Sequence, residues 1–349
     1  MRPDPTNHLT PRGTSVKNSD VIKLAHGSGG LLTNRLMRDV VLKYFKDKTV
    51  KRLEDSAQLN IESRDIAFTT DSYVIDPIFF PGGDIGKLAI CGTVNDLAMQ
   101  GAIPKHISFS LIIEEGFLLK DLERIIKSAS QAAMRAKVRV VCGDTKVVEK
   151  SKADKIFITT SGIGIIKIKL GKEKIRIGDK ILVSGTIGDH GIAVMNQRLN
   201  LGLRANLKSD VAPLNLITNR LLPFKSSIHC MRDPTRGGVA SVLNETIDGT
   251  RYGIMLREGE IPIKREVIGA TDILGIDPLY VANEGKFIAF VAHNVAEKVL
   301  KKIKSHPLGK DAAIIGEVVK EPRGVWLKTK IGGVHPLLLL EAEGLPRIC

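Results

Sequence analysis

Several features that mark large classes of proteins are missing from this sequence. No apolar run approaches the roughly 20 residues of a membrane span, and the opening MRPDPTNHLTPRG lacks the apolar core of a signal peptide. The 4 cysteines among 349 residues form no CxxC pair, so neither a zinc knuckle nor a disulfide scaffold is indicated. We therefore expect a cytoplasmic protein without a membrane segment.

Aromatic residues are also few, at 4%, although the net charge is +14. Lysines and arginines are spread along the chain, without an aromatic-rich basic block, a zinc-finger pattern or an RNA-binding pattern. Dispersed charge gives general attraction to anions without a surface that reads bases. We expect a solvated charged surface or an anionic substrate or partner, and no nucleic acid.

The two commonest nucleotide-binding motifs are absent as well. GxxxxGK[ST] fails at Gly86-Lys87 and at Gly285-Lys286, because Pro81 and Tyr280 stand five positions before these glycines. GxGxxG fails because HGSGGLL lacks its last glycine. Neither a P-loop nor a Rossmann domain is supported.

Periodicity predicts a globular protein with two mixed domains. Strand patterns fall at 65–71, 107–113, 138–145, 155–166, 180–183, 286–292 and 312–319, and helix patterns at 84–101, 118–137, 189–195, 237–247 and 295–303. The pattern restarts near 175, which favours two α/β or α+β units. The predicted organisation is a flexible arm at 1–20, domains at 21–168 and 169–331, and a mobile tail at 332–349.

Four aspartates stand at the ends of apolar segments: Asp55 in LEDSA, Asp71 in FTTDS, Asp96 in VNDLA and Asp144 in CGDTK. Each alone is as well explained as a cap or turn residue. Four converging carboxylates would repel one another, and hard divalent cations relieve such repulsion. Because Mg²⁺ binds substrate phosphates together with one or two carboxylates, the set suits a nucleoside triphosphate.

Two glycine-rich segments precede helix patterns. HGSGG at 26–30 and RDPTRGG at 232–238 each offer backbone N–H groups and a helix N-terminus to an anion, and the second adds two arginines. Either one alone is commonly an ordinary turn. Together with the aspartates, they favour a phosphate-binding cleft.

At this point the residues resemble a known family. AHGSGG, EDSA, TTDSYVIDPIFFPGGDIGKLAICGTVNDLAMQGA, CGDTKVV, RDPTRGG, ANEGK and the terminal PRIC occur in this order. They resemble the HypE family of hydrogenase maturation proteins, within the aminoimidazole ribonucleotide synthetase-like, or PurM-like, superfamily. The resemblance covers about residues 22–349.

The resemblance implies a two-domain PurM-like fold of the α+β or α/β class. The N-terminal domain, 21–168, would bind ATP and Mg²⁺ and pair its sheet with that of a second copy across a two-fold axis, giving a homodimer. The C-terminal α+β domain would close the cleft, and a flexible tail would carry Cys349.

The family's reaction concerns that last residue. The carbamoyltransferase HypF transfers a carbamoyl group to the terminal cysteine, and ATP then drives dehydration of the thiocarbamate to a thiocyanate. The cyanide passes to an iron held by HypC and HypD, for [NiFe] hydrogenase. In this chain Cys349 would be the carrier, on a tail from Ile331 that can span at most about 60 Å.

Motif matches imply roles for individual residues. The carboxylates expected to hold Mg²⁺ are Asp55, Asp71, Asp96 and Asp144. The residues expected to bind ATP are Gly27, Ser28, Gly29, Gly30, Asp71, Asn95, Asp96, Asp144, Thr145, Asp233, Thr235 and Arg236. Lys146 would reach the γ-phosphate or the thiocarbamate. Glu284 is the candidate for the base, with a surface-exposed glutamate as the alternative.

Four other functions share part of this pattern. A thiamine-phosphate kinase or an aminoimidazole ribonucleotide synthetase would share the aspartates but has no use for a terminal PRIC. Selenophosphate synthetase would be expected to carry a cysteine near the first glycine motif, whereas no cysteine here precedes Cys91. A nonenzymatic scaffold would bind ATP without consuming it.

Overall fold

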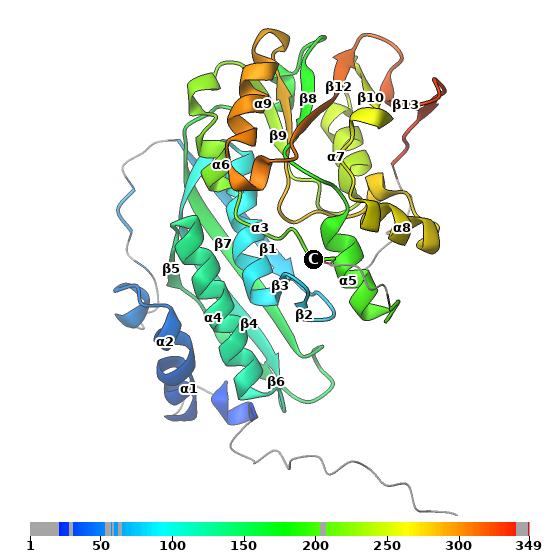
Figure 1. Ribbon diagram of the computed structural model, residues 1–349. Coiled ribbons are helices and arrows are strands. Elements are labelled where there is room, and N and C mark those ends of the chain that lie inside the picture. Colours follow the sequence, from blue (N-terminus) through cyan, green and yellow to red (C-terminus); the bar gives the residue numbers. More distant parts are fainter. Residues whose placement is uncertain are drawn as a thin grey trace, which may run out of the picture.

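The computed structural model describes residues 21–27, 31–52, 57, 59–61, 65–202, 207–339 and 348. The arm predicted at 1–20 lies outside these residues, as do the candidates Ser28, Gly29, Gly30, Asp55 and Cys349. The described part contains two sheets with their helices, and helix α3 (Ile85–Met99) packs against elements of both (Figure 1). This is the two-domain PurM-like arrangement that the sequence predicted.

The first domain is built on a five-stranded sheet with the order β1-β7-β4-β5, in which β6 also pairs with β4. β7 is antiparallel to both β1 and β4, whereas β5 and β6 run parallel to β4. The strands are β1 (Ile66–Tyr73), β4 (Ala102–Glu114), β5 (Arg139–Cys142), β6 (Thr145–Val148) and β7 (Ile156–Ile166), and the two-stranded hairpin is β2 (Phe79–Phe80) with β3 (Gly83–Asp84).

Helices α3 and α4 (Leu119–Ala136) cover one face of this sheet (Figure 1). The inward face of α4 is the predicted one, with Leu122, Ile125, Ile126 and Ala129 all fully buried. Strand residues alternate between this core and the opposite face, as expected for a sheet covered on one side. The opposite face exposes large apolar side chains: Phe68 is 67% exposed, Ile66 45% and Ile112 41%.

Helix α3 lies in the centre of the molecule. The Asp84 side chain begins it by accepting hydrogen bonds from the backbone N–H groups of Gly86 and Lys87, at 2.9 and 3.0 Å. Every residue of α3 except Lys87 and Asp96 is buried. A Cβ at Gly92 would stand 2.3 Å from the Tyr73 hydroxyl, so glycine lets β1 pack directly on the helix. Asp96 thus occupies the one open side of the helix near its C-terminus.

The second domain contains a seven-stranded sheet with the order β14-β13-β10-β12-β8-β11-β9. All pairs are antiparallel except β10 with β13. The strands are β8 (Lys180–Val183), β9 (Ile228–Arg232), β10 (Gly253–Arg257), β11 (Ile288–Val291), β12 (Ala313–Val319), β13 (Gly324–Lys328) and β14 (Val334–Pro336). The patterns found β8, β11 and β12 but missed β9, β10 and β13, which are short and lack clear alternation.

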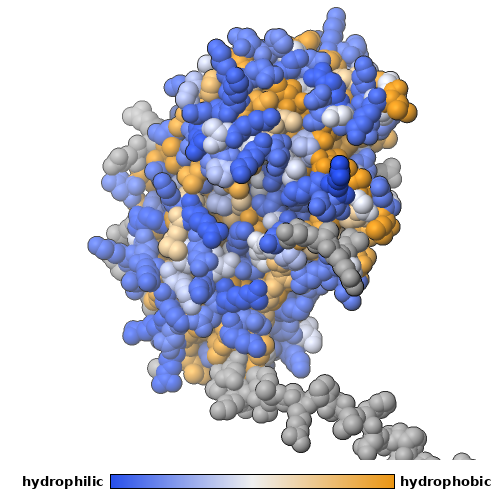
Figure 2. All heavy atoms as spheres, in the orientation of Figure 1, coloured by the Kyte–Doolittle hydropathy of each residue, from blue (hydrophilic) through white to orange (hydrophobic). Residues whose placement is uncertain are grey.

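Helices cover both faces of the second sheet. One core joins the sheet to α6 (Asn215–Asn219) and α9 (Ala296–Lys304), and it includes Ala98 and Met99 of α3. The other joins the sheet to α7 (Gly238–Ile247), while α5 (Asp189–Arg198) and α8 (Arg265–Leu274) pack on each other beside it. Figure 2 shows a mostly hydrophilic surface on this side, with hydrophobic side chains near α8, where Ile268 is 42% and Ile273 69% exposed.

Short helical segments complete the described structure. One helical stretch packs beside α4 and consists of α1 (Leu31–Leu36), η2 (Met37–Val41) and α2 (Leu42–Tyr44). The 3-10 turns are η1 (Leu24–His26), η3 (Val50–Arg52), η4 (Lys172–Lys174), η5 (Leu222–Phe224), η6 (Glu258–Glu260), η7 (Pro278–Tyr280), η8 (His293–Val295) and η9 (Pro307–Gly309). Within the described ranges, no helix has the length and apolar character needed to cross a membrane.

The sheet continues past residue 331, where the pattern had placed the start of the tail. β14 pairs with β13, and the Leu337 N–H donates to the Val325 carbonyl at 2.8 Å. Leu337 is only 3% exposed, and the Tyr280 hydroxyl donates to the Leu338 carbonyl at 2.7 Å. The stretch GVHPLLLLEAEGLPRIC was assigned to a tail because it has too few partners to form a domain, yet residues 334–337 pair with the edge of an existing sheet.

Candidate active site

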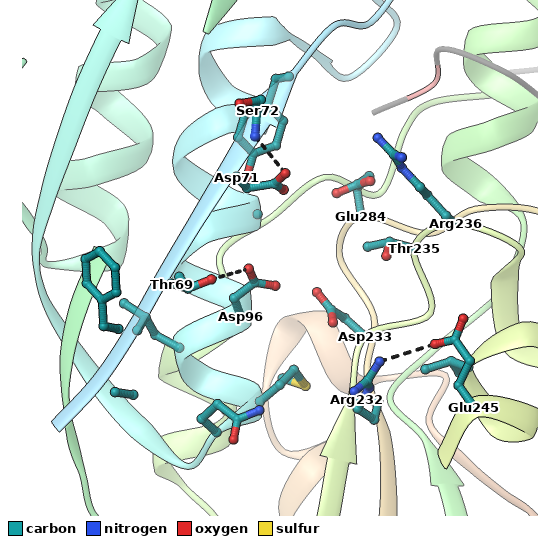
Figure 3. A pocket seen from close by; sticks show the side chains of 18 residues that line it. Thr69, Asp71, Ser72, Asp96, Arg232, Asp233, Thr235, Arg236, Glu245 and Glu284 are labelled. Carbon is teal, nitrogen blue, oxygen red and sulfur yellow. Dashed lines mark hydrogen bonds and ion pairs between the residues drawn. The ribbon is translucent and has the colours of Figure 1, made fainter. Parts of the chain in front are cut away.

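A cavity of about 450 Å³ lies where the two domains meet. The first domain contributes side chains from β1 and α3, and the second contributes the segment after β9, helix α7 and Glu284 (Figure 3). Six of the predicted site residues line it: Asp71, Asp96, Asp233, Thr235, Arg236 and Glu284. The structure thus brings together residues that are more than 200 positions apart in the chain.

Asp71 and Asp96 form the wall from the first domain. Asp71 lies within β1, two residues before the strand ends, and accepts a hydrogen bond from the Ser72 N–H at 2.7 Å. Asp96 accepts from the Thr69 hydroxyl at 2.9 Å (Figure 3). Burial raises the pKa of the Asp96 carboxyl, and the negative charge of Asp71 raises it further. The two carboxylates therefore favour a nearby cation.

Asp233 faces them from the second domain, directly after β9. Its loop is fixed from both sides, because the Thr235 N–H donates to the Asp233 carbonyl and the Asn283 N–H to the Pro234 carbonyl, each at 3.0 Å. Burial and then the charge of Asp96 raise the pKa of the Asp233 carboxyl to about 7. A carboxyl held this far above its ordinary pKa is common at functional sites.

Glu284 is the most strongly perturbed acid of the cavity. Its side chain is buried, the residue being 3% exposed, and its Oε1 has no hydrogen-bond partner. Burial, followed by the charges of Asp233 and Asp210, raises its pKa well above the ordinary value. The alternative of a surface-exposed glutamate is therefore wrong, because the Glu284 carboxyl is enclosed among other acids.

A buried ion pair fixes the backbone at Glu284. The Asp210 carboxylate accepts from the Glu284 N–H at 3.1 Å and from the Lys286 ammonium at 3.2 Å. Asp210 keeps a lowered pKa even though burial opposes it, since the charge of Lys286 and other groups more than offset the desolvation. Neither Asp210 nor Lys286 was predicted as a site residue, because no motif in the sequence links these positions.

Arginines supply the positive charge of the cavity. Arg232 and Arg236 both line it, and Arg232 lies 3.4 Å from the Glu245 carboxylate of α7 (Figure 3). Glu245 was missed by sequence reasoning. Its only signal is helical spacing, since it stands three residues after Val242, which also lines the cavity.

Asn95 has a different role from the predicted nucleotide contact. Its amide donates to the carbonyls of Ala212 and Glu284, both at 3.2 Å, and its Oδ1 accepts from the Leu214 N–H at 2.8 Å. The residue is 1% exposed and does not line the cavity. Its polar atoms are engaged in joining α3 to the second domain, directly behind Glu284.

The remaining candidates lie elsewhere in the single chain. Asp144 and Thr145 line a separate cavity of about 160 Å³, and Asp144 pairs with the ammonium of Lys146 at 3.0 Å. Lys146 lowers the pKa of Asp144, and its own side chain is 64% exposed. Gly27 packs against β6, where a Cβ would stand 2.6 Å from the Val147 nitrogen. The position of Asp144 at the end of a strand pattern did not indicate that it lines a different cavity from Asp71.

The donor atoms of the main cavity are those that suit magnesium. Its carboxylate oxygens are hard ligands, and burial and then neighbouring carboxylate charges raise the pKa values of Asp96, Asp233 and Glu284. Among the residues that the structure describes, no three His, Cys, Asp or Glu side chains form a metal site by themselves. This fits a cation that takes only one or two protein carboxylates and completes its coordination with water and phosphates.

Comparison with known proteins gives the family. Residues 53–166 match the N-terminal domain and residues 176–327 the C-terminal domain of AIR synthase related proteins. The carbamoyl dehydratase HypE of Bradyrhizobium diazoefficiens is 45% identical over 342 residues, which cover 97% of this chain and 99% of that protein.

Two solved structures are also similar. A crystal structure of hydrogenase maturation protein HypE in complex with ATP has a TM-score of 0.90 and 42% identity, covering 93% of this chain and 99% of the other. A chain from a HypE–HypF complex has a TM-score of 0.78 and 45% identity, covering 87% and 99%. With both domains matched and nearly the whole length aligned, this chain belongs to the HypE family of carbamoyl dehydratases.

Proposed function

We propose that this protein uses ATP and Mg²⁺ to dehydrate an S-carbamoyl group on its own Cys349 to a thiocyanate. The observation that supports this most directly is the buried Glu284 carboxyl, which has an unpartnered oxygen at a cavity lined by both acids and arginines. The structure of a related HypE was solved in complex with ATP, and a similar protein is named carbamoyl dehydratase HypE. The thiocyanate would supply a cyanide ligand for the iron of hydrogenase.

The chemistry is a phosphorylation followed by an elimination. The thiocarbamate oxygen attacks the γ-phosphorus of ATP, and ADP leaves. The C–O bond then breaks, phosphate departs with that oxygen, and the nitrogen loses both protons as the C≡N bond forms. Sulfur keeps its bond to carbon throughout, so the net reaction converts S–CO–NH₂ and ATP into S–CN, ADP and phosphate.

Glu284 is the proposed base for the N–H protons. Only the ionised carboxylate of Glu284 can accept these protons, and its raised pKa makes that carboxylate a stronger base than an ordinary one. The Asp210 and Lys286 pair holds its backbone in place, and Asn95 holds its carbonyl. A proton received by Glu284 is stabilised by the same burial that raises its pKa.

Asp71 and Asp96 would hold Mg²⁺, and Asp55 remains a further candidate outside the described residues. When bound, the cation neutralises charge on the phosphates during transfer. Arg232 and Arg236 can neutralise phosphate oxygens from the opposite wall, since both line the cavity. Asp233 completes the acidic ring and favours cation binding.

A homodimer would bring Asp144 and Lys146 into use. The outward face of the first sheet exposes Phe68 and Ile66, as a face that pairs with a second copy would. We propose that the paired sheets bring Lys146 of one copy to the nucleotide of the other. HypF as carbamoyl donor, HypC and HypD as cyanide acceptors, and a cytoplasmic location complete the proposal.

The intact mass of the chain tests the function. After incubation with HypF, carbamoyl phosphate and MgATP, the wild type should gain about 43 Da and then retain about 25 Da as the carbamoyl group becomes a cyano group on the thiol carrier. Cys349→Ala should show neither change. An unchanged wild-type mass with active HypF would contradict the proposal and direct attention to small-molecule phosphate acceptors.

A further inference from the structure

The penultimate residue of the chain lies in the hydrophobic core. Ile348 is 5% exposed and belongs to the same buried cluster as Phe80, Val194, Val211 and Ala282. Residues this close to a chain end are usually exposed unless something fixes them. Burial of a large aliphatic side chain stabilises the position that it occupies.

A histidine holds the backbone of the same residue. The Nε2 of His190 lies 2.5 Å from the Ile348 carbonyl oxygen, which belongs to the peptide group that links Ile348 to Cys349. A carbonyl only accepts, so Nε2 must carry the proton. Nδ1 can then accept from the Ser209 hydroxyl at 2.7 Å, and the Ser209 oxygen accepts from the Val211 N–H at 3.1 Å.

The surroundings keep this histidine in one state. His190 is fully buried, and burial lowers its pKa, so the ring is neutral and its single N–H points at the terminal peptide group. The edge of the Phe80 ring packs against it, with centroids 5.4 Å apart and planes at 90°. One donor, one acceptor and one ring contact fix both the tautomer and the orientation.

The same elements lead to the proposed base. Ser209 precedes Asp210, whose carboxylate accepts from the Glu284 N–H, and Gly191, which follows His190, donates to the Ala282 carbonyl at 3.1 Å. The segment that positions Glu284 and the residues that bind Ile348 are therefore parts of one hydrogen-bonded unit. The end of the chain bound at this place therefore has a defined position relative to the proposed base, Glu284.

We propose that His190, together with the buried apolar cluster that includes Phe80, Val194, Val211 and Ala282, is a docking site for the chain's own terminal Ile348 that positions the following cysteine for dehydration. This rests on the proposed function and adds a positioning residue and a selectivity for the penultimate side chain. Ile348 is the anchor, because its position is fixed by packing and by one directed hydrogen bond. In this proposal the position of Cys349 is set by the docking of Ile348.

Two variants of His190 test the proposal. His190→Leu removes the donor, whereas His190→Gln retains an N–H of similar reach. In a single turnover of carbamoylated protein with MgATP, H190L should dehydrate about tenfold more slowly, the effect of losing one buried hydrogen bond, with carbamoylation by HypF unimpaired. H190Q should recover most of the rate. Ile348→Ala should resemble H190L without altering the folded domains.

Release of the last residues by a carboxypeptidase, followed by mass, gives a readout independent of catalysis. H190L and I348A should lose residues 349 and 348 about tenfold faster than the wild type, and H190Q should not. His229, a second buried histidine that pairs with Asp179 at 2.7 Å, supplies the control. H229L should lower thermal stability while leaving terminal release unchanged.

The outcomes separate the two proposals. Equal dehydration and equal terminal release in H190L and wild type would overturn the docking site, as would an H229L effect as large as that of H190L. If the wild type never gains a carbamoyl group, the proposed function fails, while the carboxypeptidase comparison still decides whether His190 binds Ile348.

Discussion

Replacing Glu284 with glutamine should make the stability of this protein less sensitive to rising pH. The wild-type carboxyl is buried, and its pKa lies well above the value of 4.5 that it has in an unfolded chain, first because of burial and then because of Asp233 and Asp210. The native state therefore keeps a proton that the unfolded state releases. Wild-type stability is fullest below about pH 4.5 and falls as pH rises toward the folded pKa, and glutamine abolishes this loss.

The size of the effect follows from linkage. Each pH unit between the unfolded and folded pKa costs the wild type about 1.4 kcal/mol that the glutamine variant retains. At about 2.1 cal/mol/K per residue, unfolding 349 residues has an entropy of about 0.7 kcal/mol/K, so each pH unit should widen the gap in melting temperature by about 2 °C. Above about pH 4.5 the gap should therefore grow steadily with pH until the folded pKa of Glu284 is reached.

Calorimetric scans at several pH values, without nucleotide or divalent cations, measure this gap. Glu245→Gln is the matched control, because Glu245 also lines the cavity but its side chain is 52% exposed and pairs with Arg232. Its melting temperature should run parallel to that of the wild type. A constant gap between E284Q and wild type across this range would refute the claim that Glu284 is protonated in the native state.

The same variant also tests the catalytic assignment. If Glu284 removes the N–H protons, E284Q should slow dehydration by roughly 10²–10⁴-fold while carbamoylation continues. The variant would then be stable and carbamoylated yet unable to form the 25 Da product. Rapid turnover by E284Q would assign the base elsewhere without affecting the stability argument.

Other expected results concern the interface, a turn and the dimer. Asn95→Leu would leave the Leu214 N–H and two carbonyls unpaired, so thermal unfolding should show a loss of at least about 2 kcal/mol; an unchanged midpoint would mean that water replaces the amide. Gly238→Ala would place a Cβ 2.5 Å from the Leu279 carbonyl at a φ of +62°, and should lower the melting temperature more than Gly249→Ala, where φ is +73° and no atom lies within 4 Å. Phe68→Ser should shift light-scattering mass from dimer toward monomer, whereas an unchanged mass would exclude this face.

Local patterning predicted the first domain well and the second only in part. Helix α4 shows a clear apolar face, and β1, β4 and β7 have enough length for alternation to appear. β9 and β10 have five residues each, and neither shows a regular alternation of buried and exposed positions. Pro104, which was expected to end the preceding helix, lies within β4 beside a register shift that accommodates it.

The candidate site was predictable where chemistry and spacing coincide. Asp71, Asp96, Asp233 and Glu284 were expected and meet at one cavity. Asn95 was misassigned because an asparagine beside an aspartate gives no sign of which side chain faces the open side of a helix. The family motifs include none of His190, Asp210 or Lys286 in a catalytic role, and only the tertiary structure shows that they pack around Glu284 and the chain end.

The attachment of β14 to the second sheet determines the effective concentration of the terminal thiol at the cavity of the same chain. Cys349 lies ten positions after Leu339, a distance along the chain that can span at most about 33–36 Å in any conformation. Confinement to that radius corresponds to an effective concentration on the order of millimolar. If the chain acts as proposed, dehydration is first order in protein and needs no encounter, whereas a partner present at micromolar levels must bind tightly enough to compete with the chain's own site.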